Sequence, residues 1–244
     1  TAFAHGIMML LLLAVVRNDL LADWRRSLPA HTPNFFFINI PAEENVAFAN
    51  FLTERGAQDV LVRPMVRARM TQINGKPVED IKFATQRGRN FAERDQNITW
   101  AEQLHRDNEI TQGKWFTRQD FGKPLVSIST EYAEEMNLKL GDELGFDVAG
   151  EGFSARVSSV RRVKWDSFQP NFFLMFAPGL LEGTQGTWMT ATHLEVNNPK
   201  LIGDLVRRFP SVSVFNVDEL LNQVRSVVDK AVAAVQSVFV FTLF

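Results

Sequence analysis

The 244-residue chain has no cysteine and almost no net charge, since 26 basic side chains stand against 28 acidic ones. The absence of cysteine excludes disulfide bonds and thiolate metal sites. A formal net charge of −2 gives no support to a nucleic-acid-binding domain, which would carry a basic face. Tyrosine is nearly absent as well, with 1 residue against 21 phenylalanines, and this ratio favours buried or lipid-facing aromatic side chains.

Recognisable catalytic motifs are also absent. The chain has no G-x-x-x-x-G-K-[ST] phosphate loop, no G-x-S-x-G turn, no H-E-x-x-H and no G-x-G-x-x-G after a strand. The four histidines, His5, His31, His105 and His193, are too scattered for a metal signature. We therefore predict no catalytic residues, no cofactor-binding residues and no metal ligands, and hence a protein that is not an enzyme.

Two groups of polar residues could bind a ligand or simply face solvent. His105, Asp107 and Glu109 alternate along the chain and could in principle offer ligands to a metal ion, but a solvated charged loop is the simpler interpretation. Arg67 and Arg69 alternate with apolar residues, so one face of a predicted strand would be positive. That face could bind an anionic headgroup or an acidic partner, although we expect a solvated or ion-paired sheet face instead.

A second basic group and an aromatic run could also either bind a ligand or have a purely structural role. Arg161, Arg162 and Lys164 could meet an anionic partner, and again we expect a solvated or ion-paired face. The Phe35–Phe37 triplet could line a lipid groove, but a buried central strand explains it more simply.

Both ends of the chain are apolar. Residues 2–16 and 231–244 contain no charged side chain except for the titratable His5, and each run is shorter than the roughly 20 residues that span a membrane. We interpret the chain as an excerpt of a longer protein, cut inside two membrane helices. A signal peptide would carry a basic start, which residues 1–16 lack; two buried core helices are the other alternative.

The C-terminal segment predicts one long helix. Asn216 and Glu219 have the spacing of a variant capping box, and the apolar residues that follow fall on one face. After Lys230 the charges stop and the sequence becomes apolar all round, as in a helix that passes from a protein surface into lipid or a deep core. A helix over residues 217–244 would be about 40 Å long.

The region between the ends predicts two strand–helix–strand units. A strand over 34–40, a helix over 41–55 and a strand over 60–73 come first, closed by the hairpin signal Asn74-Gly75. A strand over 187–196, a helix from Asn198-Pro199 and a strand over 211–215 come second. Two such units separated by an insertion indicate a split ferredoxin-like α+β layer.

The insertion predicts a β-rich meander with one helix. Thr130 is the expected cap of a short helix that carries Tyr132, Ala133 and Met136. Turns at Gly141-Asp142 and at 150–152 lead into strands over 143–148 and 153–163. Residues 84–123 are polar and allow no confident assignment.

Several segments resemble the extracytoplasmic domain of FtsX-like/MacB-like ABC transporter permeases, and most of all the large permeases of the YbbP type. The resemblance covers residues 33–56, 62–78, 137–183, 187–196 and 217–244. Its most specific blocks are R-x-R-x-x-x-I-N-G from Arg67 and W-D-S-F-x-P-N-F-F from Trp165.

The resemblance implies a MacB-like periplasmic domain in an α+β fold. It predicts a partial transmembrane helix and stalk (1–29), a porter-like subdomain in two halves (30–84 and 185–216), an inserted β-rich subdomain (85–184), and a stalk helix that enters a transmembrane helix (217–244). Such a domain would face the periplasm from the bacterial inner membrane.

The same resemblance implies the partners and the activity. A separate cytoplasmic ABC ATPase subunit would hydrolyse ATP, and the permease would transmit its motion across the bilayer to a lipid-like, lipoprotein or hydrophobic cargo. Membrane lipid and a periplasmic esterase or lysophospholipase are the other expected partners. The alternatives are a membrane-anchored periplasmic adaptor or lipid-binding protein with no ATPase partner, and an anchored periplasmic hydrolase.

Overall fold

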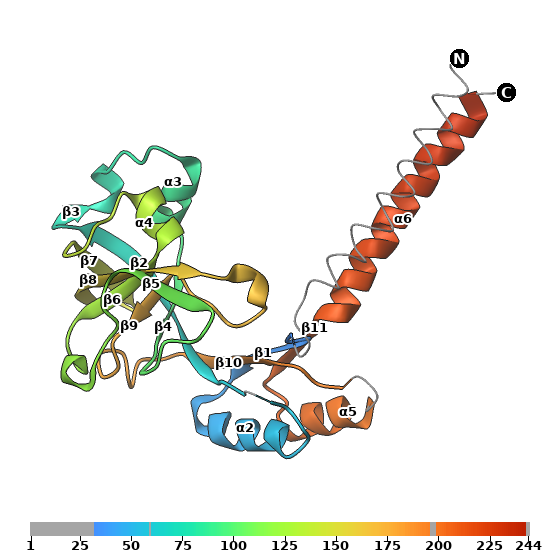
Figure 1. Ribbon diagram of the computed structural model, residues 1–244, viewed down its shortest axis with the longest axis horizontal. Coiled ribbons are helices and arrows are strands. Elements are labelled where there is room, and N and C mark those ends of the chain that lie inside the picture. Colours follow the sequence, from blue (N-terminus) through green and yellow to red (C-terminus); the bar gives the residue numbers. More distant parts are fainter. Residues whose placement is uncertain (1–31, 59, 196–198, 243–244) are drawn as a thin grey trace.

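The computed structural model describes residues 32–58, 60–195 and 199–242. Eleven strands form one continuous pairing system with two main hydrophobic cores. The strands form two parts, each built around one of these cores. A long helix, α6 (Val217–Thr242), projects away from both parts (Figure 1). The fold mixes helices and strands, which agrees in this coarse sense with the predicted α+β class.

The first part is a four-stranded antiparallel sheet in the order β11–β1–β10–β2, so the strands of the two strand–helix–strand units alternate across it. Helices α2 and α5 lie on one face (Figure 1). The elements are β1 (Phe35–Ile40), the 3-10 helix η1 (Ala42–Glu44), α2 (Asn45–Thr53), β2 (Arg63–Ile73), β10 (Thr187–Thr192), α5 (Pro199–Arg208) and β11 (Ser213–Asn216).

Alternation along β1 explains where α2 and α5 pack. Phe35 and Phe37 share one face of the sheet, and both are buried. The ring centroid of Phe48 in α2 lies 5.3 Å from that of Phe37 and 5.1 Å from that of Phe209, which directly follows α5. The phenylalanine run therefore belongs to a buried central strand, which is the simpler of its two interpretations.

The second part is a closed sheet of six strands, and β2 belongs to it as well. From Val66 onward β2 pairs with β4 and then β7, and the ring closes through β9, β6 and β8. The β4–β9 and β6–β8 contacts are parallel and the other four are antiparallel. The strands are β4 (Gln96–Trp100), β6 (Leu125–Ser129), β7 (Glu143–Val148), β8 (Glu151–Val163) and β9 (Leu174–Phe176).

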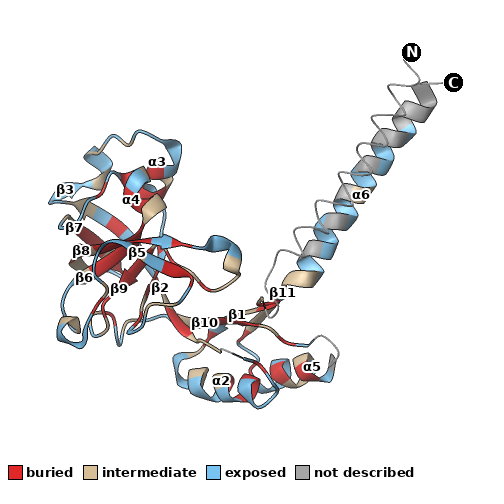
Figure 2. Ribbon diagram, viewed as in Figure 1, coloured by how far each residue is buried: buried red, intermediate tan, exposed pale blue. Residues whose placement is uncertain are grey.

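Shorter elements surround the ring. They are β3 (Lys76–Pro77), η2 (Val78–Asp80), α3 (Gln86–Glu93), β5 (Asn108–Gly113), η3 (Arg118–Asp120), α4 (Thr130–Met136) and η4 (Trp165–Ser167). The rings of Phe91 from α3 and Tyr132 from α4 are in contact, with 4.8 Å between centroids and an interplanar angle of 45°, and both belong to the core of the ring. Figure 2 shows buried residues on the strands of the ring and also on α2 and α5 of the first part.

Local signals in the sequence locate most of these elements. Asn74 and Gly75 have φ angles of 51° and 76° and form the two-residue hairpin between β2 and β3, which confirms that prediction. The strand after Gly141-Asp142 is confirmed too. The expected helix cap at Thr130 is wrong by one residue, because the side chain of Ser129 accepts the hydrogen bond from the Tyr132 N–H.

Helix α6 begins directly where β11 ends. The side-chain oxygen of Asn216 accepts hydrogen bonds from the backbone N–H groups of Asp218 (3.0 Å) and Glu219 (3.3 Å), so the predicted cap is confirmed. Within the described part of the chain, no helix combines the length and apolarity needed to cross a membrane. The predicted segment over residues 1–29 lies outside the described residues. The predicted domain limits at residues 84 and 184 stay predictions.

Two glycines with positive φ angles give a test of how closely β5 approaches β8. A Cβ on Gly113 (φ +75°), at the end of β5, would overlap the carbonyl oxygen of Ser158, whereas a Cβ on Gly150 (φ +91°) would meet open space. We expect Gly150→Ala to lower the free energy of unfolding by about 1–2 kcal/mol, the cost of a left-handed alanine. We expect Gly113→Ala to lower it by about 3 kcal/mol or more. Urea denaturation measures both, and equal losses would contradict the close approach of β5 and β8.

Candidate functional site

A cleft of about 470 Å³ lies where the two sheets join. Trp188 from β10 and Trp100 from β4 form part of its wall, with ring centroids 6.1 Å apart and an interplanar angle of 74°. Arg63, the first residue of β2, also lines it, as do His105 and the two acidic residues Glu102 and Glu182. The cleft therefore combines aromatic walls with charged groups from both parts of the molecule.

Arg63 is buried, with only 5% of its surface exposed. Its side chain makes no hydrogen bond and no ion pair with another described residue, and the opposite charge that acts on it is that of Asp107. Burial lowers the pKa of Arg63 to about 10, and the negative charge of Asp107 opposes that shift. The guanidinium is still positive at neutral pH.

Arg161 on β8 is a second buried guanidinium close to the first. It donates to the side-chain oxygen of Asn108 at 2.6 Å and to the carbonyl oxygen of Phe172, while its Nε–H has no hydrogen-bond partner. Burial lowers its pKa to about 9; the positive charge of Arg63 lowers the pKa further, and Glu131 raises it. Arg161 thus fixes the loop before β9 to β5.

The three basic residues Arg161, Arg162 and Lys164 do not form one patch. Arg162 faces solvent and pairs with Glu109, with 3.1 Å between Nη1 and Oε2. Lys164 is exposed as well. The expectation of a solvated or paired face is therefore confirmed for Arg162 and Lys164 and wrong for Arg161, because successive residues of a strand point to opposite faces.

The alternating group His105, Asp107 and Glu109 is separated by the fold. The Nδ1 of His105 lies 3.3 Å from the Oδ2 of Asp107, and both side chains are largely buried. Glu109 is on β5 and pairs with Arg162. In residues 32–242, outside the masked positions, no three histidine or acidic side chains are grouped to hold a metal ion.

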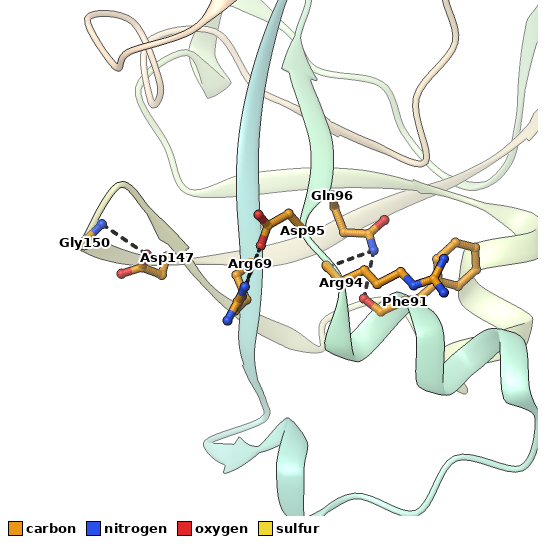
Figure 3. A network of polar contacts seen from close by, with 7 residues as sticks. All are labelled: Arg69, Phe91, Arg94, Asp95, Gln96, Asp147 and Gly150. Carbon is orange, nitrogen blue, oxygen red and sulfur yellow. Dashed lines mark hydrogen bonds and ion pairs between the residues drawn. The ribbon is translucent and has the colours of Figure 1, made fainter.

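Arg67 and Arg69 face solvent, since β2 alternates as predicted between buried Val66, Ala68 and Met70 and exposed arginines. Two open grooves, of about 650 and 810 Å³, meet at Arg69. The Nη2 of Arg69 lies 3.1 Å from the Oδ1 of Asp95 (Figure 3). The exposed face is thus partly ion-paired, as expected.

Short-range polar contacts are also found close to Asp95 along the chain and around Asp147, and both of these residues line the smaller groove. Gln96 donates from Nε2 to the carbonyl oxygen of Phe91 at 2.9 Å, and the Gly150 N–H donates to Asp147 at 3.1 Å (Figure 3). Acidic and basic residues both line each groove, so neither groove presents a single sign of charge.

Sequence reasoning missed Arg63, the central residue of the cleft. Arg63 opens a strand and precedes Pro64, a pattern that resembles an ordinary exposed strand end. What marks the cleft is a buried arginine beside two tryptophans. These three residues, at positions 63, 100 and 188, are far apart in the sequence and meet only in the folded chain.

Comparison with known proteins places the chain among homologues of ABC transporter permeases. One relative is the ABC transporter permease YbbP of Escherichia coli (strain K12), which is 35% identical over 224 residues. The match covers 92% of this chain and 26% of the relative, so the chain spans about a quarter of that permease.

A structural comparison finds a domain named as part of a permease protein from Porphyromonas gingivalis. It has 11% sequence identity and a TM-score of 0.33, over 74% of this chain and 85% of that one. No family model matches the chain.

Adjacent arginines on β8 provide a matched test of the buried site. We expect Arg161→Ala to lower the free energy of unfolding by about 2–3 kcal/mol, because the side-chain oxygen of Asn108 and the Phe172 carbonyl lose their buried donor. Arg162→Ala removes only an exposed ion pair and should cost at most about 1 kcal/mol. Chemical denaturation of both variants measures the difference, and similar losses would show that Arg161 does not anchor the loop.

Proposed function

We propose that the chain is the extracytoplasmic part of an ABC transporter permease and that it transmits ATP-driven motion across the membrane. The observation that carries the proposal is the homology to YbbP over 92% of the chain. The continuous helix α6, about 39 Å long for its 26 residues, supports it because a stiff helix can carry a displacement over that distance.

The base of α6 supports a lever mechanism. The N–H of Val217, the first residue of α6, donates to the carbonyl oxygen of Asn34 at 2.8 Å. The buried side chain of Asn34 donates to the Leu194 carbonyl and accepts from the Leu194 N–H, each at 2.9 Å. A tilt of α6 would therefore move β1 and the chain after β10 together, and β2 would carry the motion into the closed sheet.

In this proposal the chain itself catalyses no reaction. ATP hydrolysis belongs to a separate cytoplasmic ATPase subunit, and the domain faces the periplasm from the inner membrane. The four-stranded layer is the split ferredoxin-like porter subdomain, and the closed sheet is the inserted β-rich subdomain. The cargo is lipid-like, a lipoprotein or another hydrophobic molecule, or the domain controls a periplasmic partner enzyme.

Purification of the full-length permease from membranes tests the proposal. We expect an ATPase subunit to co-purify in fixed stoichiometry, with its ATPase activity dependent on the permease. If the full-length protein purifies without an ATPase subunit, a membrane-anchored adaptor or lipid-binding protein would be favoured. Hydrolysis of an ester or peptide by the 244-residue chain alone would favour an enzyme.

A proline in α6 tests the lever directly. Ser226 is exposed in the middle of the helix, and Ser226→Pro removes a backbone donor and kinks the helix. We expect the full-length permease with Ser226→Pro to keep its ATPase partner but to lose most of the transport per ATP hydrolysed. Ser226→Ala, which keeps the helix, is the control. Unchanged transport per ATP in the proline variant would refute the lever.

A further inference from the structure

Arg63 is a buried cation for which the described residues supply no direct partner. Only 5% of the surface of Arg63 is exposed, and no side-chain hydrogen bond or ion pair joins it to another described residue; the charge of Asp107 acts on it, and Asp107 is itself 3.3 Å from His105. A buried charge is costly unless it is paired and hydrogen-bonded. Because Arg63 lines the cleft, a ligand there could reach its donors.

The rest of the cleft fits an apolar body. Trp100 and Trp188 form its aromatic wall, and Leu61, Val62 and Leu104 add aliphatic surface. A volume of about 470 Å³ lies in the ordinary range of small-molecule sites. A site with one cation beside apolar walls fits a molecule with one anionic end and an apolar remainder.

The acidic residues of the cleft restrict the charge of that anion. Glu102 is partly neutralised by Arg118, with 3.6 Å between oxygen and nitrogen, whereas Glu182 lies in the lining without an ion pair in the described structure. A dianionic phosphate would be repelled by these carboxylates more strongly than a monoanion would. A carboxylate also matches the two parallel N–H donors of a guanidinium.

We propose that this cleft binds a small amphiphilic monocarboxylate, with its carboxylate on Arg63 and its apolar part against Trp100 and Trp188. The ligand bridges the two sheets, because Trp188 belongs to β10 and Trp100 to β4. Occupancy of the cleft would resist a change in the angle between the sheets. Binding by the chain does not depend on the proposed permease function.

Calorimetric titration of the 244-residue chain with octanoate tests the proposal. We expect octanoate to bind at least tenfold more tightly than octan-1-ol and more tightly than octyl phosphate. Arg63→Gln should weaken octanoate binding tenfold or more. The matched control is Arg67→Gln, an exposed arginine on the same strand that does not line the cleft, and it should leave the affinity unchanged.

Several results would overturn the proposal. If octan-1-ol binds as tightly as octanoate, the apolar surface binds the probe without Arg63. The same conclusion follows if the Arg63→Gln variant binds octanoate with wild-type affinity. Tighter binding of octyl phosphate would refute the choice of a monocarboxylate, and no binding of octanoate would refute the site. If Arg63→Gln does not fold, Arg63→Lys keeps the charge but loses the paired donors, and it should still bind octanoate more weakly than the wild type.

Discussion

The structure depends on one strand that is hydrogen-bonded into both sheets. Residues 63–65 of β2 pair with β10, and from Val66 onward the same strand pairs with β4 and β7. Because ladder pairing fixes register, the two hydrophobic cores cannot slide past each other along this strand without breaking backbone hydrogen bonds. Arg63 and the cleft lie at the point where the pairing partners change.

The same logic orders the path from α6 to the closed sheet. Helix α6 follows β11, β11 pairs with β1, β1 with β10, and β10 with β2. Asn34 adds a shortcut, because its backbone and side chain join the start of α6 to the segment after β10. Any displacement of the helix therefore passes through backbone ladders, which are stiffer than contacts between surface side chains.

Local chemistry made part of this fold predictable. The hairpin at Asn74-Gly75 and the helix cap at Asn216 depend only on residues within four positions along the chain, and the sequence predicts both. The closed ring depends instead on pairings between distant strands, such as β4 with β9, which leave no short-range pattern. Strand alternation implies that Arg161 and Arg162 face opposite sides, but only the packing of β5 and β6 on β8 decides that Arg161 is inside.

The burial of Arg161 and the burial of Arg63 have different explanations. Replacing buried ionic groups by apolar ones is often neutral or stabilising, so burial of a charge alone is weak support for a role in stability. Arg161 has a structural explanation, because its donors hold Asn108 and the Phe172 carbonyl and so attach a loop to the sheet. Arg63 makes no such bonds to the described residues, and the positive charges of Arg63 and Arg161 disfavour each other. The ligand proposed for the cleft would account for a cation at that position, since Arg63 lines it.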